Sequence, residues 1–296
     1  MKILLTVLEG IRPKQWLKNL FIFMPLLFGS LLFNVEKLLD SILAFVIFCL
    51  ISGGVYLMND IRDRQKDKVH PKKRKRPVAS GRLSVKLASL ISIILIVISL
   101  SWSYLTEWKL FIVVLLYVLL HIFYTFRIKH EVILDVILIA VGFELRIWGG
   151  AVMIGIEPSV WLQLCVFVLA LFLGFIKRRQ EKSLLYGKAE DHREVLRYYR
   201  PYFLDQMILI SATLCVVFYG LYSVTSDVVA RIGGNQMAYT IPFVVYGIFR
   251  YLYLVHVKRL GGDPGEVLIS DIPFVINMIM WLLVSAFIIY NPLRMA

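Results

Sequence analysis

The sequence predicts an all-α polytopic membrane protein, and three observations carry that prediction. Of its 296 residues, 59% are hydrophobic, whereas a soluble domain holds about 45–50% apolar residues. The apolar residues gather in runs close to the roughly 20 residues that a helix needs to cross a bilayer. Lys and Arg gather between those runs. We therefore expect nine transmembrane helices bundled around a central cavity, forming a single intramembrane domain over residues 1–296.

Nine apolar runs are the candidate spans. The first run is short and contains Pro25, so its ends are the least defined, and the fourth and fifth are separated only by the tight turn at residues 127–130. In chain order, the predicted spans cover residues 20–34, 38–58, 85–105, 109–126, 131–154, 159–176, 203–225, 238–257 and 270–290.

The distribution of positive charge predicts how these spans are oriented. With the N-terminus inside, 27 of the 33 Lys and Arg residues fall in inner segments and four in outer segments. Such an excess is typical of cytoplasmic loops. We expect a multi-pass protein of the plasma (inner) membrane, with the N-terminus and the active-site loops in the cytosol. The net charge of +13 then faces the cytosol, and no nucleic-acid-binding motif accompanies it, so we expect no nucleic-acid partner.

Three carboxylates stand where the second predicted span reaches the water. Asp60, Asp63 and Asp67 are spaced by three and four residues, and Asn59 lies beside Asp63. On one continuous helix the three carboxylates share a face. Clustered carboxylates repel one another unless a cation lies between them, and Mg²⁺ prefers oxygen ligands. The pattern predicts a magnesium site at the membrane surface.

A basic segment follows this acidic cluster and includes Arg74 and Arg76. Its cations suit phosphate, so acid and base together indicate a site for Mg²⁺ and a diphosphate. The alternative interpretation is a solvated helix end whose acids pair with Arg62, Arg64 and Lys66.

Arg146 is a single charge inside the fifth predicted span. A charge within a membrane helix is costly and usually faces a cavity or a partner. We expect it to contact phosphate or pyrophosphate. The alternative is an internal ion pair with Glu144 or another acid, although residues two apart do not share a helix face.

A second polar cluster follows the sixth span. Lys177, Arg178 and Glu181 open it, and Tyr198 lies further along the same loop. Both clusters follow an even-numbered span, which is a weak internal echo between two pseudo-similar halves, about residues 1–130 and 131–296. A helical bundle could bring a metal-binding lip opposite a phosphate-binding lip. The alternative is a plain positive anchor at the membrane surface.

Two further groups of charge are candidates for substrate binding. Lys14 and Lys18 belong to a basic entry before the first span, and Arg250 lies on the eighth span. Asp263, in the turn after that span, or Asp271, at the start of the ninth span, could orient a ribose hydroxyl or a basic ligand.

These motifs resemble the UbiA superfamily of intramembrane prenyltransferases. The superfamily-wide signal is the motif Asn-Asp-x-x-Asp-x-x-x-Asp at residues 59–67 after the second of nine spans. Three further motifs are similar to the decaprenyl-phosphate phosphoribosyltransferase branch. They are Arg-Pro-Lys-Gln-Trp-Leu-Lys-Asn at 12–19, His-Pro-x-x-Arg-x-Arg-Pro at 70–77 and Lys-Arg-Arg at 177–179.

The resemblance implies a UbiA-like fold, phosphoribosyl diphosphate as donor, a polyprenyl phosphate as acceptor, and Mg²⁺. Ordinary prenyltransferases carry a second Asp-rich motif after the sixth span, where this chain has only Glu181. We expect Asp60, Asp63 and Asp67 to bind the metal, and Asp60, Asp63, Arg146 and Lys177 to be catalytic. The expected substrate-binding residues are Lys14, Lys18, Asn59, Arg74, Arg76, Lys177, Arg178, Glu181, Tyr198 and Arg250.

Two other functions stay open from the sequence. One is a UbiA-type prenyltransferase that uses a prenyl diphosphate and an aromatic or quinone-precursor acceptor. The other is a transporter or lipid-phosphate flippase, although transporters place their sites near the midplane and the acidic cluster lies at the mouth. The sequence leaves open the polyprenyl chain length, a homo-oligomeric state and the glycan pathway served by the product.

Overall fold

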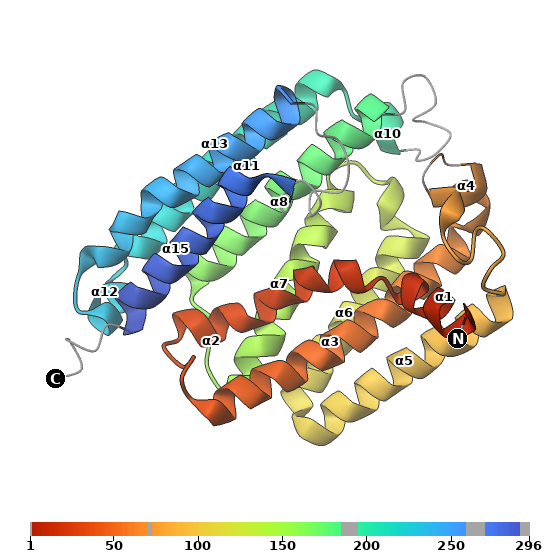
Figure 1. Cartoon of the computed structure of the whole chain (residues 1–296), viewed down its shortest axis with the longest axis horizontal. Coiled ribbons are helices and arrows are strands. Elements are labelled where there is room, and N and C mark those ends of the chain that lie inside the picture. Colours follow the sequence, from red (N-terminus) through yellow and green to blue (C-terminus); the bar gives the residue numbers. More distant parts are fainter. Residues whose placement is uncertain (1, 70, 72, 185–194, 259–269, 291–296) are drawn as a thin grey trace. The chain divides into compact units, whose positions relative to one another are not determined.

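The structure is a computed structural model that describes residues 2–69, 71, 73–184, 195–258 and 270–290 (Figure 1). No strand occurs among these residues, and eight of their helices are long and apolar enough to cross a membrane. The chain is therefore an all-α, multi-pass membrane protein, as predicted. It forms two compact units, Met1–Glu157 with Glu190–Arg197 and Pro158–Ala189 with Tyr198–Ala296.

The first unit begins with short helical segments where the sequence predicts its first span. These are α1 (Lys2–Ile11), the 3₁₀ helix η1 (Pro13–Phe23) and α2 (Met24–Phe28). Arg12, which precedes Pro13, separates α1 from η1 with a left-handed φ of 56°. No single long helix covers residues 20–34, so the count of nine is not confirmed.

The length of this segment nevertheless matches a membrane. The 11 residues of η1 and the five of α2 extend over about 30 Å together, at roughly 2.0 and 1.5 Å per residue. That is about the thickness of the hydrocarbon core. A 3₁₀ helix thus reaches as far as a longer α-helix with fewer residues.

Four long helices complete most of the first unit. The side chain of Asn34 accepts a hydrogen bond from the amide of Lys37 at 3.1 Å, and Ser84 does the same for Leu87 at 3.3 Å; these N-caps fix the starts of two helices. The unit's remaining elements are α3 (Val35–Arg62), α4 (Arg64–Val69), η2 (Lys73–Lys75), α5 (Val85–Thr106), α6 (Trp108–Phe126), η3 (Ile128–His130) and α7 (Leu134–Ile154).

Gly150 lets η1 lie directly against α7. A Cβ atom at this position would come within 2.0 Å of the backbone oxygen of Ile22. Any larger residue would push the two helices apart, as is common where small residues line membrane helix contacts. The contact matters for the site because it sets the position of η1 next to the charged face of α7.

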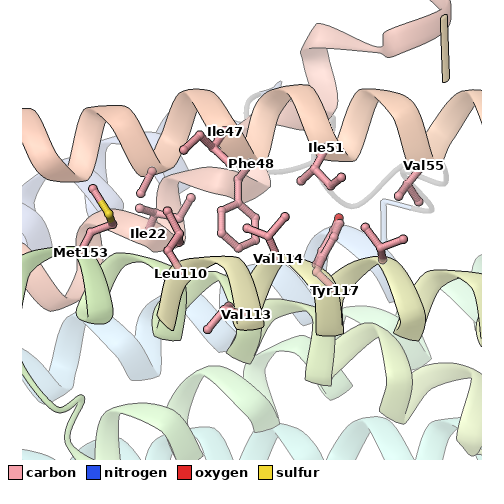
Figure 2. Packing of buried hydrophobic residues seen from close by; sticks show 12 residues of the cluster. Ile22, Ile47, Phe48, Ile51, Val55, Leu110, Val113, Val114, Tyr117 and Met153 are labelled. Atoms are coloured by element: carbon pink, nitrogen blue, oxygen red, sulfur yellow. The ribbon is translucent and has the colours of Figure 1, made fainter. Parts of the chain in front are cut away.

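A buried apolar cluster joins η1, α3, α6 and α7 (Figure 2). Phe48 of α3 meets the ring of Tyr117 of α6 edge-on, with centroids 5.5 Å apart. Tyr117 is fully buried. Through Tyr117, this apolar cluster adjoins the polar side chains of the candidate site. Its members are Ile22, Ala44, Ile47, Phe48, Ile51, Val55, Leu110, Val113, Val114, Tyr117, Val118 and Met153.

The second unit is also a helix bundle. Its helices are tied internally by polar contacts between apolar stretches: the hydroxyl of Tyr219 accepts a hydrogen bond from Trp281 Nε1 at 2.8 Å and lies 2.5 Å from Thr240 Oγ1. The described elements are α8 (Val160–Leu184), α11 (Pro201–Val224), α12 (Ser226–Ile232), η4 (Asn235–Thr240), α13 (Ile241–His256) and α15 (Ile272–Tyr290), with the short α10 (Val195–Tyr198) at the sequence boundary between the units. The pseudo-similar halves and the central cavity stay predictions.

Candidate active site

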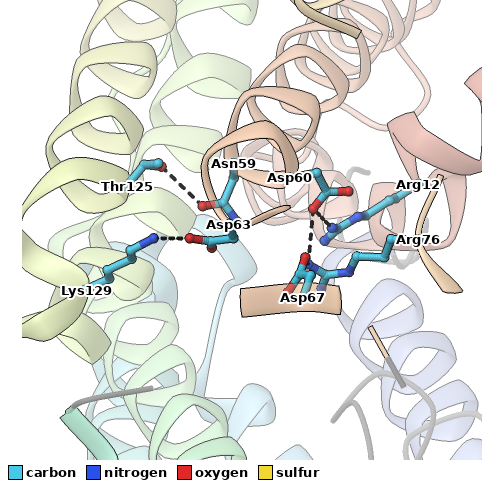
Figure 3. Close-up of polar contacts among 8 residues, drawn as sticks. All are labelled: Arg12, Asn59, Asp60, Asp63, Asp67, Arg76, Thr125 and Lys129. Atoms are coloured by element: carbon cyan, nitrogen blue, oxygen red, sulfur yellow. Dashed lines mark hydrogen bonds and ion pairs between the residues drawn. The ribbon is translucent and has the colours of Figure 1, made fainter. Parts of the chain in front are cut away.

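Asp60 is the buried centre of the acidic cluster, in the last turn of α3. Only 1% of its surface is exposed. Its Oδ1 atom accepts hydrogen bonds from Arg12 and, at 3.1 Å, from Nη1 of Arg76 (Figure 3). Its Oδ2 atom is buried and has no hydrogen-bond partner among the described residues. One carboxylate oxygen is thus held by two cations, and the other is left for a further ligand.

Asp67 meets Asp60 through the same guanidinium group. Nη1 of Arg76 also donates to Oδ2 of Asp67 at 2.7 Å, so this one nitrogen joins both carboxylates. Burial raises the pKa of the Asp67 carboxyl above its ordinary value, although the nearby charges of Arg76 and Lys73 act to lower it. The two acids are therefore held close together by a positive group between them.

Asp63 turns away from the other two carboxylates, so the prediction that all three share one face is wrong. The helix is not continuous: α3 ends at Arg62, Asp63 is its C-cap with ψ of 5°, and α4 begins at Arg64. Asp63 instead pairs with Lys129 of η3. Asn59 lies on this same side, where its Oδ1 accepts from Thr125 at 3.5 Å (Figure 3).

The solvated-end alternative for this cluster does not describe what the structure shows. Asp60 and Asp67 are 1% and 4% exposed, and the arginines that hold them come from outside the helix end, at positions 12 and 76. A buried carboxylate pair costs more than a solvated one. The cluster is a built site.

The residues present fit a magnesium ion held by two carboxylates. Mg²⁺ usually takes one or two protein carboxylates and completes its octahedron with substrate phosphates and water. Asp60 and Asp67 share one positive group, and Asp60 keeps a buried oxygen without a partner. No group of three or more His, Cys, Asp or Glu surrounds one point in the described part of the chain, which agrees with the outward turn of Asp63.

Arg146 belongs to a second group of polar side chains in the first unit, separate from the acidic cluster. It is 4% exposed, and its Nε and Nη2 atoms donate to Asn19 Oδ1 at 2.7 Å and to the Tyr117 hydroxyl at 2.8 Å. The hydrogen-bond partners of Arg146 among the described residues are all neutral, so the alternative of an internal ion pair with Glu144 or another acid finds no support there. Asn19 and Tyr117 come from η1 and α6, so no local sequence pattern pairs them with Arg146.

The predicted basic lip belongs to the second unit. Arg178 is 1% exposed and donates to Oε2 of Glu181 at 3.0 Å, one turn along α8. Arg179 pairs with Asp205 of α11 at 2.9 Å, and Lys182 donates to the backbone oxygen of Tyr199. Lys177 lies on the same helix. That this end of α8 faces the acidic cluster stays a prediction.

Arg250 and Asp271 form a pair within the second unit. Nη2 of Arg250 lies 2.9 Å from Oδ2 of Asp271, and the amide of Phe274 donates to Oδ1 at 2.9 Å. The hydrogen bond from Arg250 lowers the pKa of the Asp271 carboxyl below its ordinary value. Asp271 thus holds the side chain of Arg250, and a role for it toward a ribose hydroxyl or a basic ligand stays a prediction.

The remaining predicted residues are not gathered at the acidic cluster by any contact described above. Lys14, Arg74 and Tyr198 are exposed, and Lys18 is partly exposed on η1. His70 and Lys72, within the basic motif at 70–77, lie outside the described residues, and so does Asp263.

Sequence reasoning did not select Arg12 or Lys129 for the site. They are 48 and 66 residues away from the acids they bind. A signal for both was present: each is a Lys or Arg in a segment assigned to the same membrane side as the acidic cluster.

The fold and this acidic site can be compared with known proteins. The sequence profile of the UbiA prenyltransferase family matches residues 22–264, more than half of the chain. The chain belongs to the UbiA prenyltransferase family. This confirms the resemblance seen in the motifs.

Relatives and solved structures agree with this membership. The chain is 33% identical to a decaprenyl-phosphate phosphoribosyltransferase of Corynebacterium glutamicum, covering 96% of this chain and 86% of the relative. It is 30% identical to one of Mycobacterium tuberculosis, covering 93% and 91%. A UbiA homolog from Archaeoglobus fulgidus bound to DMAPP and Mg²⁺ matches with a TM-score of 0.71 at 19% identity, covering 96% and 99%. This last likeness confirms the UbiA-like fold.

Proposed function

We propose that this UbiA family member transfers a 5-phosphoribosyl group from phosphoribosyl diphosphate to a polyprenyl phosphate of the decaprenyl type, releasing pyrophosphate, with Mg²⁺. The observation that carries the proposal is the likeness to enzymes named decaprenyl-phosphate phosphoribosyltransferase, at 29–33% identity over 93–96% of the chain. The basic end of α8, where ordinary prenyltransferases have a second Asp-rich motif, supports an anionic acceptor.

The donor diphosphate belongs at the acidic cluster. Asp60 and Asp67 are the residues that would hold the metal, because they already share a cation and Asp60 has a buried oxygen to offer. When bound, Mg²⁺ neutralises the diphosphate and stabilises the pyrophosphate that leaves. Arg12 and Arg76, which contact Asp60 in the structure, would donate N–H groups to diphosphate oxygens.

The reaction exchanges one C–O bond for another. The bond from ribose carbon 1 to the diphosphate oxygen breaks, and pyrophosphate leaves with the electron pair. An oxygen of the lipid phosphate supplies the pair for the new bond to carbon 1. Because that phosphate is already ionised, no general base is needed. The chain's residues therefore act by positioning and by stabilising charge.

The acceptor needs cations and an apolar path. Lys177 and Arg178 are candidates for the lipid phosphate, and the isoprenoid tail would lie along apolar helix surfaces in the bilayer. The charge distribution supports an orientation with the N-terminus and these loops in the cytosol, in the plasma membrane. The product, a polyprenyl-phosphoryl-5-phosphoribose, is a lipid-linked sugar precursor suited to building a cell-wall or other glycan.

The test is a transfer assay with the purified full chain, Mg²⁺, phosphoribosyl diphosphate and a polyprenyl monophosphate. We expect pyrophosphate release and a lipid whose mass grows by one phosphoribosyl unit, both only with Mg²⁺. Transfer of a prenyl group to an aromatic acid instead would make the chain an ordinary UbiA prenyltransferase. Movement of lipid phosphate without pyrophosphate release would indicate a flippase. Either result overturns the proposal.

A further inference from the structure

Arg146 is a buried cation whose partners among the described residues are all neutral. Its three hydrogen bonds run to Asn19 Oδ1 at 2.7 Å, Gly142 O at 2.6 Å and the Tyr117 hydroxyl at 2.8 Å. Its Cζ atom lies 4.9 Å from the centroid of the Tyr117 ring and 5.4 Å from that of Phe143. Within the described part of the chain no carboxylate pairs with it, although 96% of its surface is covered.

The neutral partners hold the guanidinium in one place. The amide of Asn19 is itself fixed, since its Nδ2 atom lies 3.3 Å from Cys49 Sγ and 3.4 Å from Ser52 Oγ on α3. This turns its oxygen toward Arg146. A guanidinium group has five N–H donors, so three are used and two have no acceptor among the described residues. The neutral partners therefore fix the position of the guanidinium group without neutralising its charge.

A buried charge without a counter-charge is unfavourable, because burial removes water that the protein does not replace. The other deeply buried arginine described above, Arg178, has its carboxylate in Glu181. No described residue supplies such a charge to Arg146, whereas a bound anion would, and exclusion of water makes that attraction stronger. The site therefore suits an anionic ligand, which no described residue replaces.

This cation lies at a different level from the acidic cluster. Tyr117, which binds Arg146, and Thr125, which contacts Asn59, are both on α6 and eight residues apart. Eight residues of α-helix rise about 12 Å. The first unit thus carries two ligand positions, one for a metal-bound diphosphate and a deeper one for a second anion.

We propose that Arg146, positioned by Asn19 and Tyr117, is a subsite for the phosphate monoester group of a substrate. Its part in turnover rests on the proposed function. Two sources share this chemistry: the 5-phosphate of phosphoribosyl diphosphate and the phosphate of the polyprenyl acceptor. The subsite makes the enzyme selective for whichever substrate carries that group, because an analogue without it leaves the buried cation unpaired.

Binding without turnover tests the subsite. The detergent-purified full chain is titrated by calorimetry with ribose 5-phosphate, with ribose, and with a short-chain prenyl monophosphate, all without Mg²⁺. We expect one of the two phosphates to bind, and Arg146→Gln to weaken it by about tenfold or more. Arg146→Lys, which keeps the charge, is expected to lose less. Lys37→Gln serves as control, since Lys37 pairs with Asp40 at the other end of α3.

Comparing the binding of the two phosphates shows which substrate occupies the subsite. Loss of ribose 5-phosphate binding assigns the subsite to the donor, and loss of prenyl phosphate binding assigns it to the acceptor. In the transfer assay the KM of that same substrate is expected to rise. Equal affinities in wild type and Arg146→Gln for both phosphates, or no binding of either by wild type, would overturn the subsite.

A second variant guards against misfolding of Arg146→Gln. Tyr117→Phe keeps the ring in the core and removes only the hydroxyl that positions Nη2. It is expected to lower the affinity for the same phosphate by a smaller factor than Arg146→Gln does, and to leave the affinity for the other phosphate unchanged. An unchanged affinity for both would contradict the positioning role. Arg146-dependent phosphate binding in a chain that makes no phosphoribosyl lipid would refute the proposed function and leave the subsite standing.

Discussion

The cytosolic ends proposed for α3 and α8 have opposite designs. At the end of α3 the carboxylates are buried and their arginines are partly exposed: the side chains of Asp60 and Arg12 are 1% and 21% exposed. At the end of α8 the order is reversed, because Arg178 is 1% exposed and Glu181 is 21% exposed. In each pair the buried group is held firmly, and the exposed partner is the one that solvent and ligands can replace. At the end of α3 the exchangeable partner is thus a cation, and at the end of α8 it is an anion.

Removing the buried charge at α3 should have the largest effect. Asp60→Asn keeps the shape and removes the charge that Arg12, Arg76 and the metal share. We expect transfer activity to fall by at least about 100-fold, since even outer-shell changes at metal sites cost about 10–100-fold. Asp40→Asn, in the surface pair with Lys37, is the matched control. Activity near that of wild type in Asp60→Asn would contradict the role proposed for the buried carboxylate at the end of α3.

At α8, the two members of one pair should respond unequally. Arg178→Gln removes the buried cation and is expected to raise the KM for polyprenyl phosphate by about tenfold. Glu181→Gln removes only the exposed partner, so a much smaller change is expected. Initial rates over a range of lipid concentrations measure both. A larger defect in Glu181→Gln than in Arg178→Gln would reverse the assignment of fixed and exchangeable groups.

The contact between Asp63 and Lys129 raises the question of how Lys129 acts at the end of α3. Because Lys129 contacts Asp63 and lies on η3, we expect it to act mainly through that carboxylate. Asp63→Asn and Lys129→Gln should each lower activity, and the double variant should be little worse than Asp63→Asn alone. A double-mutant cycle on kcat/KM measures this coupling. Additive losses would show that Lys129 contacts substrate independently.

The close contact of η1 with α7 should be sensitive to one methyl group. Gly150→Ala places a Cβ against the backbone of Ile22, which cannot move without shifting Asn19 on the same element, whereas the same change at Gly220 of α11 meets open space. We expect Gly150→Ala to lower the thermal unfolding temperature and Gly220→Ala to leave it unchanged or slightly higher. Thermal unfolding of both in detergent is the measurement. Equal behaviour would refute the close approach.

The smallest expected effect is a pH dependence in the second unit. The pKa of Asp271 is lowered by Arg250, so the carboxylate is favoured in the folded chain. Its contribution to stability is present above the ordinary Asp pKa of about 3.9 and is lost as pH falls through the lower folded value. The unfolding temperatures of wild type and Asp271→Asn should therefore differ at pH 6 and converge in acid. A difference that grows in acid would contradict this sign.

The sequence predicts the parts of this molecule that depend on local pattern. Apolar runs identify the eight long spans, and the acidic motif includes Asp60 and Asp67 among its three candidate metal ligands. It misplaces Asp63, because a helix that ends at Arg62 cannot be distinguished from one that continues. It also cannot find the partners of Arg146, since Asn19 is 127 residues away and Tyr117 is 29. Contacts between elements depend on packing, such as that allowed by Gly150, which no motif encodes.

The most direct test of the central claim is pyrophosphate release by wild type and Asp60→Asn, with phosphoribosyl diphosphate and polyprenyl phosphate, over a range of Mg²⁺ concentrations. We expect release that depends on both substrates and on Mg²⁺ in wild type, and at least a roughly 100-fold loss in Asp60→Asn with unfolding behaviour retained. Release by wild type that is indifferent to Mg²⁺, or full activity in Asp60→Asn, would contradict it.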